Sequence, residues 1–225
     1  MMEQDYSKFL ETYTTEFLSD IDTEIHNIML DKFASLTKNK DNFVLFDVGC
    51  NSGSFIKTVK NKKINSTIHS FEPHPYLSKY VEEKYPEVIC NQLCLHNFDG
   101  VCNINIPSIS VGISSVLNRE VFNQLKNSQD IFILECEAMK LDTYCEKQNI
   151  NNIDFLKMDV EGAEYYVLEG AKKMLSENKI FCGQLEVGIE EDGISTSQIV
   201  ELLYSHGYDI DRSISTDYFF YLKNI

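Results

Sequence analysis

Basic residues are scarce in this sequence of 225 residues. Lysine and arginine together number 20 against 35 aspartates and glutamates, so the formal net charge is −15, and the arginines are Arg119 and Arg212. A general nucleic-acid-binding protein needs a basic surface that neutralises phosphates. The composition therefore argues against a nucleic-acid partner and against a large, repeatedly phosphorylated substrate.

The sequence also lacks the marks of zinc binding and of secretion. No C-x-x-C pair occurs and the five histidines lie far apart, so no zinc site is indicated. No apolar run approaches about 18 residues, and residues 1–9 contain neither a basic start nor an apolar signal core. We therefore expect a cytoplasmic protein without a membrane span. We expect its seven cysteines to be buried and reduced: Cys50, Cys90, Cys94, Cys102, Cys136, Cys145 and Cys182.

Apolar content and chain length predict one main domain. Hydrophobic residues make up 43% of the chain, enough for a substantial core, and 225 residues are few for two enzyme-sized domains. Residues 5–36 carry apolar side chains every three or four positions, which predicts amphipathic helix. We expect a helical segment over residues 1–40 and one domain over residues 41–225. The segment packs on that domain, covers its active site or forms the interface of a homo-oligomer.

From residue 43 onward, short apolar runs alternate with helical segments. This alternation predicts an α/β fold with a parallel sheet and right-handed crossovers. Residues 102–106 are expected to form an antiparallel excursion and residues 107–118 a loop. Two final strands at 208–211 and 218–222 predict a closing antiparallel pair, which ordinary dinucleotide-binding domains usually lack. The other expected strands are 43–48, 67–71, 88–93, 153–158 and 180–187, and the expected helices are 54–60, 76–84, 141–148, 164–175 and 197–206.

The first expected strand runs into the motif DVGCNSG at positions 47–53. Its carboxylate, Asp47, and its glycines, Gly49 and Gly53, fall where strand turns into helix, at the sheet edge where open α/β folds bind ligands. Gly49 permits a tight turn and a close approach to a ligand, and Gly53 relieves crowding as the helix begins. Asn51 and Ser54 occupy the second and third glycine positions of the dinucleotide motif G-x-G-x-x-G, which is therefore absent. The turn suits a cationic ligand, although a purely structural turn is an alternative.

The second expected strand ends in FEPHP, at positions 71–75. Glu72 follows Asp47 by 25 positions and is expected at the same sheet edge, where a carboxylate can accept hydrogen bonds from both ribose hydroxyls. Pro73 fixes the exit of the chain from the strand. A solvent-facing glutamate is the plain alternative, and the recurrence of acids at successive strand ends weighs against it.

A third strand-end motif, DFLKMDVEGAE, covers positions 154–164. Period two places Lys157 and Asp159 on one side of the strand, and Asp159 at its tip is the better placed for chemistry. Glu161 and Glu164 either act in catalysis or favour the positive end of the following helix.

Taken in order, FDVGCNSGSF, FEPHP and DFLKMDVEGAEYYVLEGA resemble the FkbM family of S-adenosylmethionine-dependent methyltransferases, over roughly residues 43–187. The resemblance implies a Rossmann-like, seven-stranded class I methyltransferase sheet, acting commonly on hydroxyl groups of sugars or natural products. Asp159 and Glu161 would face the reaction centre. Residues 91–95, with Cys94 and Leu95, and Ser114-Ser115 would approach the adenine and the substrate side. The implied cofactor contacts are Asp47, Gly49, Asn51, Gly53 and Glu72.

The leading hypothesis is O-methylation, in which a hydroxyl oxygen of a small molecule or glycan attacks the sulfonium methyl group in line. Asp159 is the candidate base or acceptor anchor, and Lys157, His74 and Glu186 are lesser candidates. We favour a metal-free base over Mg²⁺ held by Asp159 and Glu186, because the sequence offers no compact ligand cluster. A nicotinamide-dependent oxidoreductase and a non-catalytic, methyltransferase-like binding protein are the alternatives.

Overall fold

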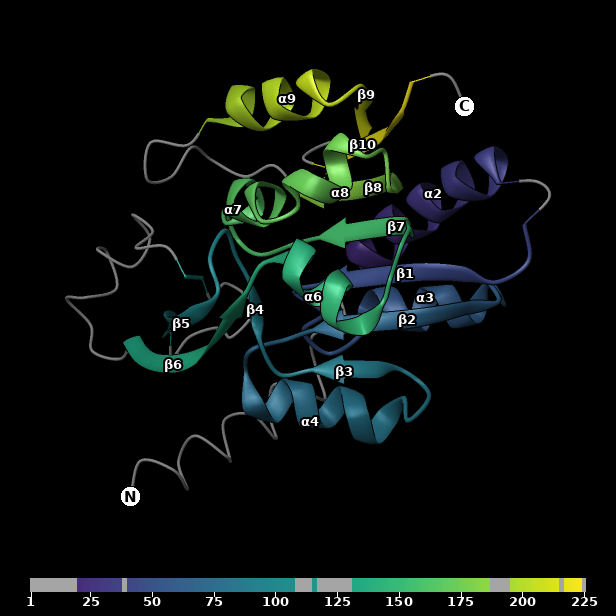
Figure 1. Cartoon of the computed structure of the whole chain (residues 1–225). Helices are drawn as coiled ribbons and strands as arrows, with labels where there is room; N and C mark the ends of the chain where they lie inside the picture. The colour runs from purple at the N-terminus through teal and green to yellow at the C-terminus, as the bar shows by residue number, and fades with distance from the viewer. Residues whose placement is uncertain are drawn as a thin grey trace.

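A seven-stranded sheet forms the centre of the protein in the computed structural model, which describes residues 20–37, 40–107, 115–116, 131–186, 195–214 and 217–223. The strand order is β3-β2-β1-β7-β8-β10-β9 (Figure 1). Neighbouring strands are parallel except β10, which is antiparallel to β8 and β9. The predicted parallel sheet with a closing antiparallel pair is thereby confirmed. The strands are β1 Phe43–Val48, β2 Ser66–Phe71, β3 Ile89–Asn91, β7 Ile153–Met158, β8 Ile180–Glu186, β9 Tyr208–Ile214 and β10 Asp217–Leu222.

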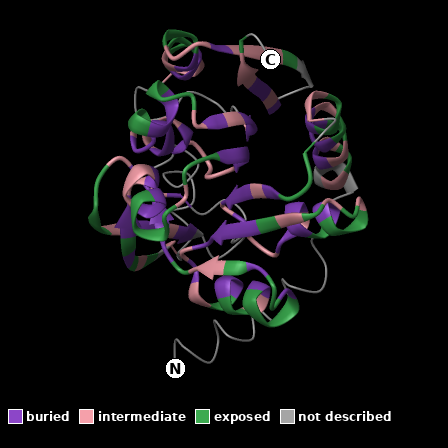
Figure 2. Cartoon of the chain, turned by 45° about the vertical axis from the view of Figure 1, so that its right-hand side comes forward, coloured by how far each residue is buried: buried purple, intermediate pink, exposed green. Residues whose placement is uncertain are grey.

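Helices cover both faces of this sheet, so its central strands are buried on both sides (Figure 2). In β1, Leu45 packs into the core under α2, α3 and α4, whereas Phe46 packs into the core under α6 to α9. Residues of a parallel strand that alternate between two covered faces read as a continuous apolar run. The helices are α2 Asp20–Leu36, α3 Ser54–Asn61, α4 Pro75–Lys84, α6 Leu141–Gln148, α7 Glu164–Glu169, α8 Lys172–Ser176 and α9 Thr196–Ser205.

The helix α2 packs on the sheet through buried apolar side chains. Met29, Leu30 and Phe33 are almost fully buried, and the Phe33 ring contacts the Phe155 ring of β7 edge-on at 5.4 Å. The earlier part of the predicted helical segment lies outside the described residues. Among the described helices, none has both the length and the apolar character that crossing a membrane requires.

A second sheet of three strands, in the order β4-β6-β5, lies beside the carboxyl edge of the first (Figure 1). Its strands are β4 Cys94–Leu95, β5 Gly100–Pro107 and β6 Ile131–Met139. The antiparallel excursion expected at 102–106 is confirmed as β5, which pairs with β6. The strand expected over 88–93 is too long, because the chain leaves β3 at Asn91 and enters this second sheet. Most of the expected loop 107–118 lies outside the described residues.

The expected helix over 164–175 is wrong as a single element. A Cβ at Gly170 would lie 2.1 Å from the backbone oxygen of His96, so this position packs closely on a neighbouring segment. The helix ends before Gly170, and a new helix, α8, begins at Lys172. The Asp142 carboxylate accepts hydrogen bonds from the backbone nitrogens of Lys173 and Met174 at 2.8 and 3.0 Å.

Candidate active site

A cavity lies between the carboxyl ends of β1, β2 and β7 and the second sheet. Its polar wall includes Gly49, Asn51 and Glu72 of the first two strand ends. Asp159 and Glu161, which follow β7, line the same cavity. The predicted meeting of three strand-end motifs at one edge is therefore present in the structure.

Gly49 joins the end of β1 to the end of β7. Its φ is 72°, and a Cβ there would lie 1.8 Å from the backbone oxygen of Asp159. The backbone nitrogen of Asp159 in turn donates to the Val48 oxygen at 3.1 Å. The turn therefore needs glycine first of all because another part of the protein lies against it.

Lys157 lies beneath the turn with its side chain almost wholly buried. Its Nζ donates to the Gly49 backbone oxygen at 2.6 Å and lies 3.1 Å from Asp47 Oδ1 and 3.5 Å from Asp159 Oδ2. Burial alone would lower the pKa of this ammonium, but the charges of Asp47 and Asp159 outweigh it and raise the pKa above its ordinary value. Lys157 therefore stays protonated, so it can position Asp159 but cannot accept a proton.

Asp47 is fully buried under the same turn. Neither carboxylate oxygen accepts a hydrogen bond from the residues that the structure describes, although Oδ1 has its ion pair with Lys157. The structure does not bring Asp47, Lys157 or Gly53 onto the cavity wall. Gly53, at φ 83°, precedes α3, and a Cβ there would lie 2.8 Å from the Tyr85 ring. The relief of crowding expected at Gly53 is thus present, and its contact with a cofactor stays a prediction.

Glu72 faces the cavity with 9% of its surface exposed. Its Oε2 accepts from the Asn51 backbone nitrogen at 2.9 Å, and its Oε1 accepts from that of His74 at 3.0 Å. Burial raises the pKa of the Glu72 carboxyl to about 7, although both hydrogen bonds oppose this shift. These two hydrogen bonds hold the carboxylate on the cavity wall, just after the end of β2.

His74 also lines the cavity, but it serves the start of α4. Its Nδ1 accepts from the Leu77 backbone nitrogen at 3.5 Å, and burial lowers the pKa of the imidazole to about 4. A neutral ring in this position acts as a helix cap.

The remaining wall of the cavity is apolar. Cys94 and Leu95, which the sequence analysis places near the adenine, do lie on it. Ile104 and Ile106 of β5 complete this wall and were not predicted. The apolar residues at alternate positions, Cys102, Ile104 and Ile106, could have indicated that one face of this strand is buried. They could not have indicated that this face borders a cavity. Leu77, Leu93 and Val116 add to the apolar surface.

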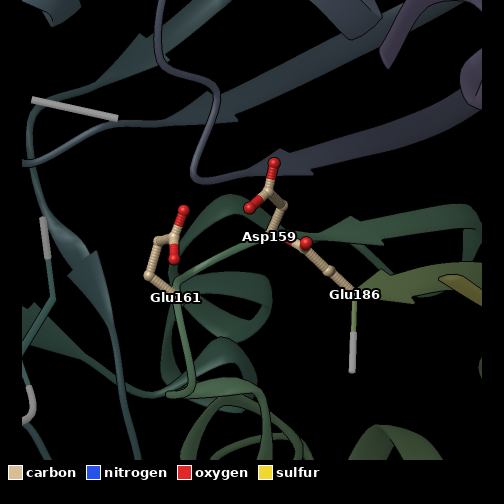
Figure 3. Close-up of side chains that lie close together, drawn as sticks. All are labelled: Asp159, Glu161 and Glu186. Atoms are coloured by element: carbon tan, nitrogen blue, oxygen red, sulfur yellow. The ribbon is translucent and has the colours of Figure 1, made fainter. Parts of the chain in front are cut away.

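Three acids gather at the end of β7 and β8 (Figure 3). One carboxylate oxygen each from Asp159, Glu161 and Glu186 lies within 4.8 Å of the others. Burial, with the charges of Asp159 and Glu161, raises the pKa of Glu186 to about 8, and the carboxyl groups of Glu186 and Asp159 hydrogen bond. The cluster can share a proton in this way, or it can offer oxygen ligands of the type that Mg²⁺ takes. The pairing of Asp159 with Glu186 was considered from the sequence, whereas the position of Glu161 beside them was not predicted.

Glu164 and Ser115 hold the loop that carries Glu161. Glu161 has a φ of 56°, unusual for a residue with a side chain. Its backbone oxygen accepts from Ser115 Oγ at 2.8 Å, and the buried Glu164 Oε1 accepts from the backbone nitrogens of Val160 and Gly162 at 3.0 and 3.4 Å. Glu164 therefore lies at the helix start, as expected, and in addition its side chain holds the turn before α7.

The sheet order, the antiparallel β10 and a cavity at the carboxyl edge define a class I, Rossmann-like methyltransferase fold. The chain belongs to the FkbM methyltransferase family, since the family's domain model matches residues 47–210. It is accordingly an S-adenosylmethionine-dependent methyltransferase, and the nicotinamide-dependent alternative is not favoured.

Individual relatives are distant. The chain is 24% identical over 174 residues to 2-O-methyltransferase NoeI of Sinorhizobium fredii, covering 72% of this chain and 71% of that protein. It is 27% identical over 167 residues to Methyltransferase 1 of Beauveria bassiana, covering 64% of each. Among solved structures, an S-adenosylmethionine-dependent methyltransferase from Clostridium acetobutylicum aligns with a TM-score of 0.48 and 10% identity, over 96% of this chain and 98% of that one.

Proposed function

We propose that this protein methylates a hydroxyl group of a sugar or another small molecule. The observation that carries the proposal is the position of Asp159, which lines the cavity, belongs to the acid cluster and has 40% of its side chain exposed. Among the relatives, the one from Sinorhizobium fredii is named a 2-O-methyltransferase. The acceptor would therefore meet Asp159 from the side of the acid cluster.

The residues of the cavity fit S-adenosylmethionine. Glu72 would accept hydrogen bonds from the ribose hydroxyls, and the apolar wall around Leu95 and Ile104 would receive the adenine. The buried Asp47 carboxylate forms an ion pair with Lys157, which also donates to the Gly49 oxygen and so holds the turn at the cavity. When bound, the cofactor supplies an electrophilic methyl group on a cationic sulfur, which the acids on the cavity wall would favour.

Asp159 would orient the acceptor hydroxyl and take its proton. Lys157 holds this carboxylate in place through its contact at 3.5 Å. Glu186, whose pKa is raised to about 8, keeps its proton at neutral pH and donates rather than accepts. A positioned base accelerates a reaction about 10²–10⁴-fold.

The charge of the acid cluster restricts the acceptor. Asp159, Glu161 and Glu186 place several carboxyl groups together, and the whole chain carries a net charge of −15. Like charges brought together cost free energy. We therefore expect neutral or cationic hydroxyl compounds to be accepted and phosphorylated ones to be rejected.

Asp159→Asn tests the proposal, because asparagine nearly preserves the shape and removes the negative charge. We expect cofactor affinity within about twofold of wild type and turnover lowered about 10²–10⁴-fold. Cell extract incubated with the protein and isotopically labelled cofactor would identify the acceptor by mass spectrometry, and calorimetric titration would measure affinity. Asp209→Asn is the matched control, since Asp209 lies on β9 and pairs with Lys223.

Each other outcome has a definite meaning. Wild-type turnover in Asp159→Asn would make Asp159 a structural strand-end residue. Cofactor binding without methyl transfer to any acceptor would favour the non-catalytic alternative, and binding of a nicotinamide cofactor instead would favour an oxidoreductase.

A chelator separates the two uses of the acid cluster. With a metal-free base, as we propose, a chelator leaves the wild-type rate unchanged. If Asp159, Glu161 and Glu186 hold Mg²⁺, the chelator stops the reaction and added Mg²⁺ restores it.

A further inference from the structure

Three thiols lie on the inward face of the second sheet, one on each strand. Cys102 of β5 and Cys136 of β6 are directly opposite each other, and their sulfur atoms are 3.3 Å apart. The Cys94 thiol of β4 belongs to the same apolar cluster and donates to the Leu95 backbone oxygen at 3.5 Å. Neither the methyl-transfer chemistry nor the structure of the main sheet requires this cluster.

We propose that Cys102 and Cys136 form a reversible disulfide, and that this oxidation weakens cofactor binding. The effect on binding rests on the cofactor site proposed above, whereas formation of the disulfide does not.

The backbone geometry permits the bond. Opposite residues of an antiparallel pair have Cα atoms about 4.5–5.5 Å apart, within the roughly 4.4–6.8 Å that disulfides span. Both thiols point to the inward face, because Val101, one residue from Cys102, and Ile133, three residues from Cys136, lie on the opposite face and are 60% and 68% exposed. Reducing the sulfur separation from 3.3 Å to the bond length of about 2.05 Å requires a shift of only about 1 Å.

Cys102 has the properties of the reactive thiol. It is half-buried, whereas Cys94 and Cys136 are 8% and 9% exposed. The hydrogen bond between the Cys136 and Cys102 sulfurs, which are 3.3 Å apart, lowers the pKa of Cys102 below its ordinary value. A lowered pKa and access to solvent are what make a cysteine nucleophilic.

The other cysteines provide the contrast. Burial raises the pKa of the Cys145 thiol to about 12 and raises those of Cys50 and Cys182 as well, so these thiols stay protonated. The expectation that all seven thiols are buried is wrong for Cys90 and Cys102, which are half-buried; all seven are free.

A low-molecular-weight disulfide such as glutathione disulfide would serve as the oxidant. The Cys102 thiolate attacks one of its sulfurs, which forms a mixed disulfide and releases one glutathione thiolate. Cys136 then loses its proton and attacks the Cys102 sulfur, which releases the second glutathione. Two protein thiols are oxidised, one glutathione disulfide is reduced, and the two protons are taken up by the glutathione released.

The disulfide would change the wall of the cofactor cavity. Cys94 and Ile104 line that cavity and pack in one cluster with Cys136. Drawing Cys102 and Cys136 together shifts β5 against β6 and displaces the packed wall that Cys94 and Ile104 form. Packing contacts weaken when a gap of about 0.5–1 Å opens between the groups, so this displacement lowers the affinity for the cofactor.

The test uses the full chain and needs no variant for its first step. Protein treated with glutathione disulfide is digested without reduction, and mass spectrometry searches for the Cys102–Cys136 cross-linked peptide. Calorimetry then measures S-adenosylmethionine affinity in reduced, oxidised and re-reduced protein. We expect the cross-link, an affinity loss of about tenfold or more, and full recovery on reduction.

Two variants act as controls. Cys145→Ser, at a buried thiol on α6, should cross-link like wild type. Cys102→Ser/Cys136→Ser should bind the cofactor equally well with and without oxidant. Absence of the cross-link, or a complete cross-link with unchanged affinity, overturns the proposal. If the cross-link forms but the reduced protein does not bind S-adenosylmethionine, the proposed cofactor site is wrong and the proposed disulfide is still supported.

Discussion

Single residues set the electrostatics of the site through burial. Lys157 is held between two carboxylates and keeps its charge, whereas Glu72 and Glu186 lose theirs more readily, at pKa values of about 7 and 8. Burial disfavours the charged form of each group. For Lys157 the two neighbouring carboxylates outweigh this cost, whereas for Glu72 and Glu186 the cost of burial prevails. The protonation of Glu72 should therefore control cofactor affinity near neutral pH.

Glu72→Ala should weaken cofactor binding about tenfold or more without unfolding the protein. Each lost hydrogen bond between the carboxylate and a ribose hydroxyl costs about 1.5–3 kcal/mol. Since burial places the Glu72 pKa at about 7, wild-type affinity should tighten as pH rises through 7, and the variant should lose this dependence. Calorimetric titration across that range measures both effects. Glu83→Ala, on the exposed face of α4, is the matched control, and equal affinities in both variants would remove Glu72 from the site.

At the scale of elements, the ends of β1 and β7 act as one unit. Gly49→Val should abolish cofactor binding together with much of the folded protein, because its Cβ would meet the Asp159 backbone oxygen at 1.8 Å. Gly49→Ala should already lower the unfolding midpoint. Gly207→Ala is the matched control, since Gly207 has a φ of 84° and no atom within 4 Å of a Cβ. It should cost only the backbone strain of about 1–2 kcal/mol.

Thermal unfolding measured by circular dichroism compares these glycine variants. Equal midpoints for Gly49→Ala and Gly207→Ala would show that the close contact between Gly49 and the Asp159 backbone does not contribute to stability.

The start of α8 depends on a side chain from another helix. Asp142 of α6 accepts from the backbone nitrogens of Lys173 and Met174, which otherwise lack a partner within so short a helix. Asp142→Ala should lower the free energy of unfolding by about 0.5–2 kcal/mol, as the loss of a helix cap does. Asp142→Asn keeps one acceptor and should lose less. Denaturant unfolding measures the difference, and identical curves for all three proteins would contradict the capping role.

At the scale of the whole molecule, stability should respond to pH through buried glutamates. Burial raises the pKa of Glu164 to about 7 from an ordinary value near 4.5, so the folded protein holds a proton there that the unfolded chain releases. The contribution of Glu164 to the free energy of unfolding is therefore fully present below about pH 4.5 and is lost as the pH rises through 7. Glu72 and Glu186 act in the same direction. Buried histidines act oppositely below about pH 6.5, because burial lowers the pKa values of His69 and His74 to about 4.

Comparison with Glu164→Gln isolates one glutamate, since all other titrating groups cancel. The stability of wild type relative to this variant should fall between about pH 4.5 and 7, by up to about 1.4 kcal/mol per pH unit. Glutamine keeps an acceptor for the Val160 nitrogen, so the variant should fold. Unfolding midpoints of cofactor-free protein over this range test the prediction. A constant difference would show that Glu164 does not hold its proton in the folded state.

Local sequence patterns were enough to predict the main sheet and the edge at which its acids meet. Six-residue strands such as β1 and β7 are apolar runs bounded by turn residues, and both signals are local. Because parallel strands share one carboxyl edge, Glu72 and Asp159 could be placed together without knowing any contact. The same local motifs carried the family resemblance, which the match over residues 47–210 confirmed.

Other properties depend on contacts between remote segments and could not be predicted from the sequence. The strand β6 was not predicted, because its apolar residues fall on both faces and Ile133 is exposed. The break at Gly170 depends on the His96 backbone, which is remote in sequence. Likewise the burial of Lys157 beside Asp47 and the position of Cys102 opposite Cys136 come from tertiary contacts and strand register. These properties arise between segments far apart in the chain, so no local pattern of residues contains them.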